Sequence, residues 1–515
     1  MVRGHHPHTP VDSGRFLRGH RVHAFLHKLR GGEMRAVTGR SGGGEAAGVG
    51  SAPRHERVLV IGLGVSGRAA ADKLLREGRK VRVNDLSDSE ELRLAGRALA
   101  ERGAEVVLGH HREEVLEGVH LVVVSPGVRS RLPLLREAEA RGIPVWSEIE
   151  LAWRYVRGPV VAVTGTNGKT TTVSMIESIL RKAGMRARAV GNIGYPMVSA
   201  VEEMEPGDIL VVEVSSFQLF YVREFRPRVA VLLNVADDHF DWHQDLEEYL
   251  EAKSRIWMNQ GPGDQAVINL DDPLCVEASR TVPAGKCFFS RRAAREACVF
   301  REGDKVLFRD PRGGRTVEVM GVEELALRGE HNLENAMAAA AASLLMGASS
   351  QAVRDALREY RGLPHRLQWV GERDGVSFYD DSKATNPHAA LRALSAFPGP
   401  VLLILGGRNK GLSFRELAAE VARKHRRGGV RMVYLIGEAA EEIESAFREE
   451  GPAVPRVIFP GLEEVFADLP GRAKAGDAVV FSPACASFDR YRDYRERGDH
   501  FQIMVRNYQG VEDGG

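Results

Sequence analysis

The chain has 515 residues, which at roughly 150 residues per domain suggests about three domains. Hydrophobic residues make up 43% and charged residues 27%, so the composition is that of a globular protein and excludes a fibrous, collagen-like or wholly disordered chain. Lys and Arg number 71 against 70 Asp and Glu, but residues 1–55 hold nine basic and three acidic residues, which leaves the remainder mildly acidic. This balance does not favour a nucleic-acid-binding surface, and we expect no nucleic-acid partner.

The longest apolar runs are VVAV at 160–163 and VLLIL at 401–405. Both are far shorter than the ~18–20 residues of a membrane helix, so we expect no membrane span. The four cysteines lack the close pairs of a zinc ribbon and are too few for a disulfide framework. We therefore expect a reducing, cytoplasmic compartment.

Residues 1–55 contain 11 of the 55 glycines and seven of the 17 histidines, with no sustained apolar period. This composition predicts a disordered N-terminal extension. The HHPH run at 5–8 could chelate a metal, and Arg-rich, acid-poor segments also occur in targeting peptides. We favour a mobile tail, of the kind that a start codon placed too early would add.

Residues 56–157 begin with the apolar run RVLVIGLGVSG, which leads into a helical pattern and then into a second strand ending at Asp85. Three further strand patterns follow at short intervals, so a Rossmann-like domain is expected. The GLGVSG turn alone is a weak signal. It could bind a dinucleotide, with Asp85 on the ribose, or the diphosphate of another nucleotide.

Residues 158–362 open with VVAVTGTNGKTTT, in which an apolar strand enters a glycine-rich turn and then a helix. Glycines let backbone N–H groups close on phosphate oxygens, Lys169 supplies a positive charge, and the Thr170 hydroxyl can bind Mg²⁺. The turn is shorter than the common phosphate loop, since only two residues separate Gly165 from Gly168. The order of strand, turn and helix nevertheless predicts a site for a nucleoside triphosphate.

Two strand ends in the same unit carry candidate metal ligands. Glu213 ends the apolar run in LVVEVSS, and His239 lies in the polar LNVADDHFDWH segment. Carboxylate oxygens suit Mg²⁺, so Glu213 is expected to hold one ion, with His239 as a ligand of a second. Asp237 and Asp238 could instead cap the following turn.

Residues 363–515 alternate strand and helix patterns, which predicts a further α/β domain with a parallel sheet. Arg366 could bind a phosphate, and Lys383 a phosphate or a carboxylate. Ser482 and Ser487 follow a strand and are suited to binding a small anion. Cys485 is expected to pack rather than react, because no histidine lies near it in the sequence.

Several motifs of the chain together resemble the Mur ligase family, between about Val58 and Phe501. In chain order they are TGTNGKTT, EVSSFQL, NVADDHFD, EAKSRI, GEHNLENAMAA, GLPHRLQ, DDSKATNP, LLILGG and SPACASFD. DDSKATNP and SPACASFD are similar to the members that add D-glutamate.

The resemblance implies an α/β fold of three domains: a Rossmann-like N-terminal domain (56–157) for the UDP substrate, a central P-loop ATPase-like domain with a mainly parallel sheet (158–362), and a Rossmann-like C-terminal ligase domain (363–515). It implies a monomeric, cytoplasmic enzyme of peptidoglycan synthesis that depends on ATP and Mg²⁺. The reaction would join D-glutamate to UDP-N-acetylmuramoyl-L-alanine through an acyl phosphate.

The resemblance also assigns residues to each ligand. Those around the UDP substrate would be Gly64, Val65, Ser66, Asp85, Gly127 and Asn192. ATP would meet Gly165, Thr166, Asn167, Gly168, Lys169, Thr170 and Thr171, with Asn335 at adenine and Arg366 and Asp381 at the phosphate and ribose side. The metal ligands would be Thr170, Glu213, His239 and a carbamylated Lys253, and D-glutamate would meet Lys383, Ser487 and Tyr494. Catalysis would involve Lys169, His239, Lys253 and Lys383.

Three positions qualify this assignment. By sequence alone Lys253 is an ordinary exposed helix lysine, and only the resemblance makes it a carbamate site. Trp242 stands where many relatives carry a basic residue, and Tyr494 replaces a frequent phenylalanine. Either change could adjust substrate contacts without abolishing them.

Other functions remain open on the sequence. GLGVSG would suit an NAD(P)H-dependent oxidoreductase, and the Lys169 loop would suit a protein that uses ATP only as a switch. Within the ligases, L-alanine, a diamino acid or glutamate on a folate would use the same loop.

Overall fold

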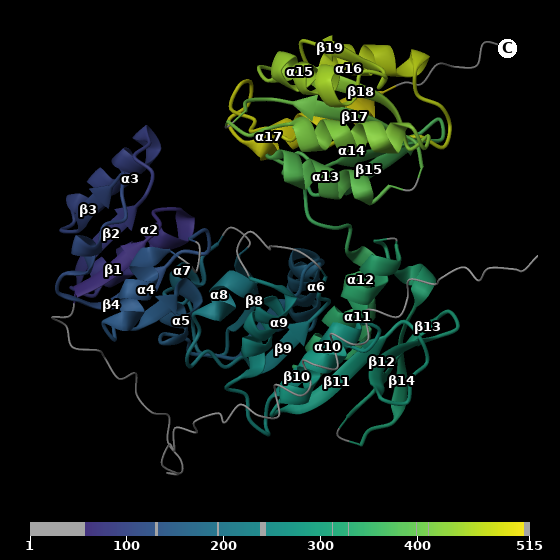
Figure 1. The fold of residues 1–515 in the computed structure, drawn as a ribbon. Coiled ribbons are helices and arrows are strands. Elements are labelled where there is room, and N and C mark those ends of the chain that lie inside the picture. The colour runs from purple at the N-terminus through teal and green to yellow at the C-terminus, as the bar shows by residue number, and fades with distance from the viewer. Residues whose placement is uncertain are drawn as a thin grey trace, which may run out of the picture. The chain divides into compact units, whose positions relative to one another are not determined.

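The structure is a computed structural model that describes residues 57–128, 132–192, 195–236, 244–311, 313–327, 329–397, 399–409 and 411–508. It contains three sheets, each flanked by helices, and most neighbouring strands are parallel (Figure 1). The predicted α/β fold class is therefore confirmed. The predicted disordered extension lies outside the described residues.

The first sheet is parallel throughout and has the order β3-β2-β1-β4-β5. Its strands are β1 (Arg57–Ile61), β2 (Lys80–Asp85), β3 (Glu105–Leu108), β4 (Val119–Val124) and β5 (Val145–Ser147). The helices are α2 (Val65–Arg76), α3 (Glu90–Ala100), η1 (Glu113–Leu116), α4 (Pro133–Ala140) and α5 (Glu148–Trp153). The strand order reverses between β1 and β4, and open α/β sheets bind ligands at such a point.

The glycine turn after β1 is fixed by a close backbone approach. A Cβ atom on Gly67 would lie 1.8 Å from the carbonyl oxygen of Gly62. Only glycine lets α2 start this close to the strand. Close packing of α2 against the end of β1 thus explains a glycine of the GLGVSG pattern, whether or not the turn also binds a ligand.

The second sheet has the order β14-β13-β12-β11-β10-β9-β6-β8-β7. Its strands are β6 (Val160–Thr164), β7 (Ala187–Gly191), β8 (Ile209–Glu213), β9 (Val229–Leu232), β10 (Gln265–Asn269), β11 (Gly285–Ser290), β12 (Ala297–Glu302), β13 (Lys305–Arg309) and β14 (Thr316–Gly321). The helices are α6 (Lys169–Lys182), α7 (Met197–Ala200), α8 (Ser216–Phe220), α9 (Leu246–Ser254), η2 (Arg255–Trp257), α10 (Pro273–Ala278), η3 (Ser279–Thr281), η4 (Val322–Glu324), α11 (Glu330–Leu345) and α12 (Ser350–Glu359).

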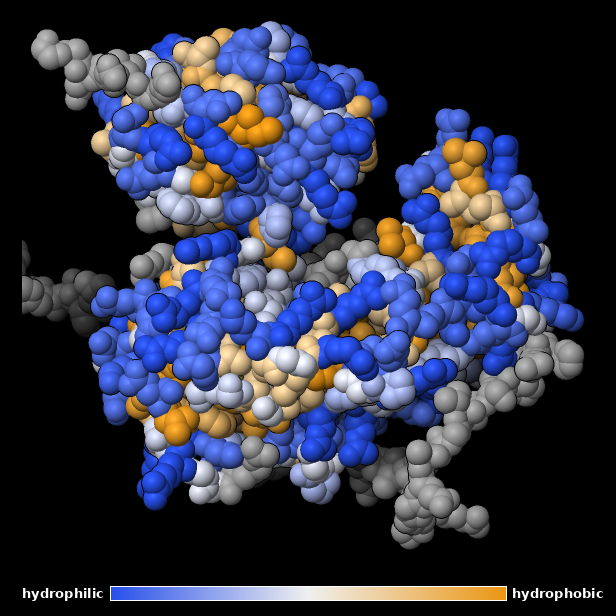
Figure 2. Space-filling model, turned by 180° about the vertical axis from the view of Figure 1, so that it is seen from behind, coloured by the Kyte–Doolittle hydropathy of each residue, from blue (hydrophilic) through white to orange (hydrophobic). Residues whose placement is uncertain are grey.

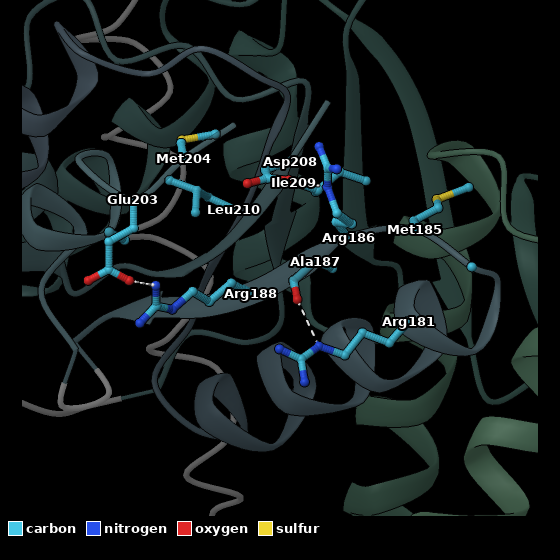
Figure 3. A pocket seen from close by; sticks show the side chains of 12 residues that line it. Arg181, Met185, Arg186, Ala187, Arg188, Glu203, Met204, Asp208, Ile209 and Leu210 are labelled. Atoms are coloured by element: carbon cyan, nitrogen blue, oxygen red, sulfur yellow. Dashed lines mark hydrogen bonds and ion pairs between the residues drawn. The ribbon is translucent and has the colours of Figure 1, made fainter. Parts of the chain in front are cut away.

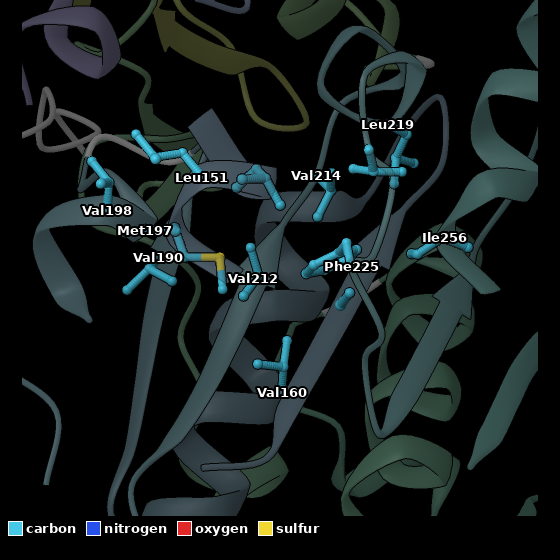
Figure 4. Close-up of a cluster of buried hydrophobic side chains, with 14 of the residues drawn as sticks. Leu151, Val160, Val190, Met197, Val198, Val212, Val214, Leu219, Phe225 and Ile256 are labelled. Atoms are coloured by element: carbon cyan, nitrogen blue, oxygen red, sulfur yellow. The ribbon is translucent and has the colours of Figure 1, made fainter. Parts of the chain in front are cut away.

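Both faces of this sheet are covered. On one face, side chains of β6, β7 and β8 pack with α5, α7 and Phe225 (Figure 4). On the other face they pack with α6 and the alanine-rich α11. Burial on both faces explains why β6 reads as a continuous apolar run instead of an alternating one.

The third sheet has the order β15-β16-β20-β17-β18-β19. Its strands are β15 (Gln368–Arg373), β16 (Val376–Asp380), β17 (Val401–Gly406), β18 (Val430–Ile436), β19 (Arg456–Phe459) and β20 (Ala478–Phe481). The helices are α13 (Pro387–Ser395), α14 (Arg415–His425), α15 (Ala440–Glu450), α16 (Leu462–Asp468), η5 (Leu469–Gly471) and α17 (Tyr494–Asn507). β15 is an edge strand antiparallel to β16, so the parallel sheet expected here has one antiparallel strand at its edge. A short turn at 374–375 joins the two strands, and so short a connection permits only antiparallel pairing.

Hydrophilic residues cover most of the face seen in Figure 2, and the hydrophobic ones form small separate groups. Among the described residues, none of the helices has the length and hydropathy to cross a membrane.

A buried carboxyl group joins α5 to α7. Glu148 is 1% exposed, and its Oε1 accepts a 2.6 Å hydrogen bond from the N–H of Val198. Its Oε2 has no hydrogen-bond partner in the described part of the chain. Burial raises the pKa of Glu148 to about 7, although hydrogen bonds from the N–H groups of Val198 and Met197 oppose the rise.

This pKa predicts a pH-dependent stability. Between the ordinary value of 4.5 and about 7, the folded state holds a proton that the unfolded chain has released, so the contribution of Glu148 to stability falls as pH rises. The thermal midpoint of the wild type should therefore decline relative to that of Glu148→Gln between about pH 5 and 8. Glu91→Gln, on the exposed surface of α3, is the control. Parallel pH profiles for wild type and Glu148→Gln would contradict the assignment.

Candidate functional site

The glycine-rich loop lies between β6 and α6, at the carboxyl end of a central strand. Gly165 and Gly168 have φ angles of 155° and 81°, which residues other than glycine rarely adopt. The helix that follows has 14 residues, and its first N–H groups point back to the loop without intrahelical partners. The positive end of the helix dipole favours an anion at this place.

The loop is held by Asn234, which follows β9. The N–H of Thr166 donates to the carbonyl oxygen of Asn234 at 2.9 Å, and the N–H of Asn167 donates to Asn234 Oδ1 at 2.8 Å. The Lys169 ammonium folds over the loop and donates to the carbonyl oxygens of Gly165 and Thr166, both at 2.8 Å. These two hydrogen bonds hold the lysine ammonium at the loop.

Helix α9 supports the loop from within the core. Lys253 is 1% exposed, and its Nζ donates to the carbonyl oxygen of Gly165 at 2.9 Å while lying 4.3 Å from the centre of the Tyr249 ring. The Tyr249 hydroxyl lies 3.2 Å from Thr166 Oγ1. The reading of Lys253 as an ordinary exposed lysine was therefore wrong, because α9 turns this face into the core beneath the loop.

Glu213 ends β8, which pairs directly with β6. Its Oε1 accepts a 3.0 Å hydrogen bond from Asn192 Nδ2, whereas Oε2 is buried without a partner among the described side chains. A buried carboxylate oxygen in that state is costly unless a cation satisfies it. Glu213 and the Thr170 hydroxyl thus provide the oxygen donors that Mg²⁺ prefers.

The second proposed metal ligand, His239, lies outside the described residues, as do Asp237, Asp238 and Trp242. Within the described residues, which omit 237–243, no group of three or more His, Cys, Asp or Glu side chains is arranged to hold a metal ion.

Asn335 comes from α11 and packs against the loop. It is largely buried, and its Oδ1 accepts a 3.4 Å hydrogen bond from Thr172 Oγ1. A Cβ atom on Gly168 would lie 2.2 Å from the same oxygen. Asn335 and Gly168 therefore fit each other closely. Thr171 lies in the first turn of α6, next to Thr172.

Arg366 and Asp381 lie at the start of the third α/β unit. The exposed Arg366 donates from Nη1 to Thr170 Oγ1 at 3.1 Å, so the structure brings Arg366 to the loop. Asp381 accepts from the N–H of Leu367 at 3.1 Å and from Ser482 Oγ at 2.6 Å. Burial raises the pKa of Asp381 to about 7 against these hydrogen bonds and the charge of Arg366.

Lys383 and Tyr494 lie together, with the Lys383 Nζ 5.4 Å from the centre of the Tyr494 ring. Ser487 is buried in the turn after β20, and its carbonyl oxygen accepts from the N–H groups of Arg490 and Tyr491. Cys485 is buried and its pKa is raised to about 12 by that burial, in line with the packing role expected from the sequence.

Five of the six residues predicted for the UDP substrate lie at or just after the ends of β1, β2 and β4. Gly64 directly precedes α2, which begins with Val65 and Ser66, and Gly127 lies exposed in the turn after β4. The Asp85 carboxylate accepts hydrogen bonds from the N–H groups of Leu63 and Ser87, at 2.7 and 2.9 Å. Asp85 therefore stabilises the turn after β1. Asn192 lies instead beside Glu213, as described above.

Asn234 and Tyr249 contact the loop but were not singled out from the sequence. Both are neutral polar residues, and neither belongs to a pattern that indicates phosphate chemistry. Asn234 had one available signal, its place directly after an apolar strand in the NVADD segment.

A pocket of about 490 Å³ lies at the edge strand β7, away from the residues described above (Figure 3). Its three arginines are each paired: Arg181 with Glu177, Arg186 with Asp208, and Arg188 with Glu203. The Arg181 side chain also donates to the carbonyl oxygen of Ala187 at 2.8 Å. Their charges are thus already used to cover the sheet edge.

Comparison with known proteins gives matches along most of the chain. Residues 56–147 match the Mur ligase MurD-like N-terminal domain, 163–343 the Mur ligase middle domain, and 365–485 the glutamate ligase domain of Mur ligases. The chain is 42% identical over 452 residues to the UDP-N-acetylmuramoylalanine--D-glutamate ligase of Pelotomaculum thermopropionicum, covering 88% of this chain and 97% of that relative. It is 41% identical over 459 residues to the ligase of the same name from Acidobacterium capsulatum, covering 89% and 98%. On this similarity, together with the phosphate-loop geometry, the chain belongs to the Mur ligase family.

Proposed function

We propose that this chain is an ATP-dependent ligase that joins D-glutamate to UDP-N-acetylmuramoyl-L-alanine in peptidoglycan synthesis. The observation that carries the proposal is the meeting of the Lys169 loop, Glu213 and Arg366 at the carboxyl ends of β6 and β8. The relatives from Pelotomaculum thermopropionicum and Acidobacterium capsulatum are named for this activity, and the chain matches nearly their whole length.

ATP is expected to place its phosphates on the loop from Gly165 to Thr171. The N-terminal N–H groups of α6, the Lys169 ammonium and the Arg366 guanidinium would neutralise the triphosphate. Lys169 would exchange its contacts with the loop carbonyl oxygens for contacts with phosphate oxygens. Asn335 and Asp381 are proposed for the adenine and the ribose side.

Thr170 and Glu213 fit a Mg²⁺ ion, since one supplies a hydroxyl and the other an unsatisfied buried carboxylate oxygen. His239 and a carbamylated Lys253 are proposed for a second ion. Bound Mg²⁺ would reduce the negative charge on the triphosphate.

The proposed reaction has two steps. A carboxylate oxygen of the L-alanyl group attacks the γ-phosphorus of ATP, forming an O–P bond as the bond to ADP breaks. The amine of D-glutamate then attacks the acyl carbon, phosphate leaves with its bonding electrons, and the nitrogen loses a proton. Much of the rate enhancement would come from holding these groups in position.

The two acidic groups of D-glutamate require cationic and hydrogen-bonding partners. Lys383 supplies the positive charge, Tyr494 lies beside it, and Ser487 is proposed as a hydroxyl donor. The UDP group is proposed to bind at the turn formed by Gly64, Val65 and Ser66, with Asp85, Gly127 and Asn192. We further propose that the enzyme acts in the cytoplasm as a monomer.

A substrate panel tests the activity directly. Phosphate release from ATP and Mg²⁺ should require UDP-N-acetylmuramoyl-L-alanine and D-glutamate together, and should be at least about 100-fold slower with L-alanine or a diamino acid. Preference for another amino acid would assign a different ligase. ADP release without an amino acid would favour an ATP switch, and oxidation of NAD(P)H would favour an oxidoreductase.

Lys169→Ala should reduce phosphate release by at least about 100-fold, because the charge that stabilises the transferred phosphoryl group is lost. Thermal unfolding should stay close to wild type. Lys182→Ala, at the other end of α6 and paired with the exposed Glu359, is the control and should remain active. Normal turnover by Lys169→Ala would remove this lysine from the mechanism.

Lys253→Ala should be inactive and partly rescued by short carboxylic acids, if a carbamate on this lysine is the functional group. Lys253→Arg separates this role from support of the loop, because arginine can donate to the Gly165 carbonyl oxygen but forms no carbamate. We expect Lys253→Arg to be inactive as well. Wild-type activity in either variant would contradict the carbamate.

A further inference from the structure

The segment that carries Arg366 has a strained backbone. His365 and Leu367, on either side of Arg366, have φ angles of 60° and 44°. Residues with a Cβ atom rarely adopt this region, and they keep it only where the surrounding structure determines it. His365 is buried whereas Arg366 is exposed. The strained backbone therefore lets the His365 side chain point into the core while the next side chain, Arg366, points outward.

A buried polar network anchors His365. Its Nδ1 lies 2.7 Å from Asp380 Oδ2, which also accepts from Gln502 Nε2 of α17 at 2.8 Å. Gln502 Nε2 further donates to Gln368 Oε1 at 3.1 Å, and the same oxygen accepts from the N–H of His365 at 3.0 Å. The side chain and the backbone of His365 are therefore both tied to α17.

The turn after β16 holds both sides of Arg366. The N–H of Lys383 donates to the His365 carbonyl oxygen at 3.0 Å, and the N–H of Leu367 donates to Asp381 Oδ1 at 3.1 Å. The buried Arg497 of α17 fixes the same turn, donating to Ser382 Oγ at 3.0 Å and to the Ser382 carbonyl oxygen at 2.7 Å. The turn that contains Ser382 and Lys383 thus links α17 to the segment on both sides of Arg366.

Gly498 makes room for this network. A Cβ atom at this position would lie 2.1 Å from His365 Nδ1 and 2.8 Å from Asp380 Oδ2. Gly498 is the fifth residue of the 14-residue helix α17, where glycine is less favourable than alanine. Close approach of the histidine gives a physical reason for this unfavourable choice.

We infer that His365, Asp380 and Gln502 are positioning residues, which hold Arg366 in the conformation that reaches the phosphate loop. The 3.1 Å hydrogen bond from Arg366 to Thr170 is the contact that the network would preserve. This inference rests on the proposed function, in which Arg366 binds the ATP phosphates. It assigns α17 a role in ATP use, although the three positioning residues themselves do not touch ATP.

Gly498→Ala tests the inference, with Gly471→Ala as the matched control because a Cβ atom there meets nothing within 4 Å. Gly498→Ala should lower kcat/KM for ATP by about tenfold or more, with the KM for the UDP substrate unchanged. Gly471→Ala should match wild type in both parameters. Gln502→Met removes the amide donor while keeping a side chain of similar size, and it should show the same defect. This second variant tests the inference even where Gly498→Ala does not fold. Wild-type kinetics in both Gly498→Ala and Gln502→Met would overturn the inference.

A double-mutant cycle separates positioning from general destabilisation. If the network acts through Arg366, adding Gln502→Met to Arg366→Ala should cost less than about twofold, because the group to be positioned is already gone. A full tenfold loss in that background would mean that the network acts in some other way, and would overturn the inference.

Amide hydrogen exchange gives a readout that needs no substrate. The N–H groups of Leu367 and Lys383 should exchange faster in Gly498→Ala and Gln502→Met than in wild type or Gly471→Ala. Unchanged exchange would overturn the anchoring itself. A wild-type enzyme without ligase activity would instead refute the proposed function, while the exchange rates would still decide whether α17 anchors the segment.

Discussion

The register between β6 and its two neighbours is the constraint on which the site depends. Parallel strands present their carboxyl ends at one edge, so the pairing of Val163 with Glu213 and of Thr164 with Leu232 brings three strand ends together. The loop follows the first strand, the carboxylate ends the second, and Asn234 follows the third. A shift of one residue in β8 would turn the Glu213 side chain to the opposite face of the sheet.

This arrangement buries polar groups that a simple core would avoid. Lys253, Glu213 and Asn335 all lie in contact with the loop or beside it, each almost fully buried. Hydrogen bonds to Gly165, Asn192 and Thr172 offset part of the desolvation cost, but Glu213 Oε2 receives none from the described residues. Such incompletely satisfied buried groups concentrate at functional sites, where a ligand completes them.

The sequence could predict those parts of the structure that follow a short local pattern. The apolar strand, the glycine turn and the helix from Val160 to Lys182 were predicted because glycine and hydrophobic periodicity report directly on backbone conformation. The antiparallel strands β13 and β14 were not predicted, since their short and partly exposed runs resemble loops. The burial of Lys253 depends on which face α9 turns to the sheet, and that is a tertiary property.

The end of β16 shows why neighbouring residues in one motif can have different tasks. Successive side chains of an extended strand point to opposite faces, so Asp380 and Asp381 cannot share one environment. The Asp380 carboxylate lies between His365 and Gln502 of α17, whereas the Asp381 carboxylate faces Leu367 and Ser482. The two carboxylates therefore hold the Arg366 segment from two directions. Asp380 contacts the His365 side chain, and Asp381 accepts from the backbone N–H of Leu367. A single strand end can in this way fix the conformation of a segment and still place a carboxylate beside the proposed nucleotide site.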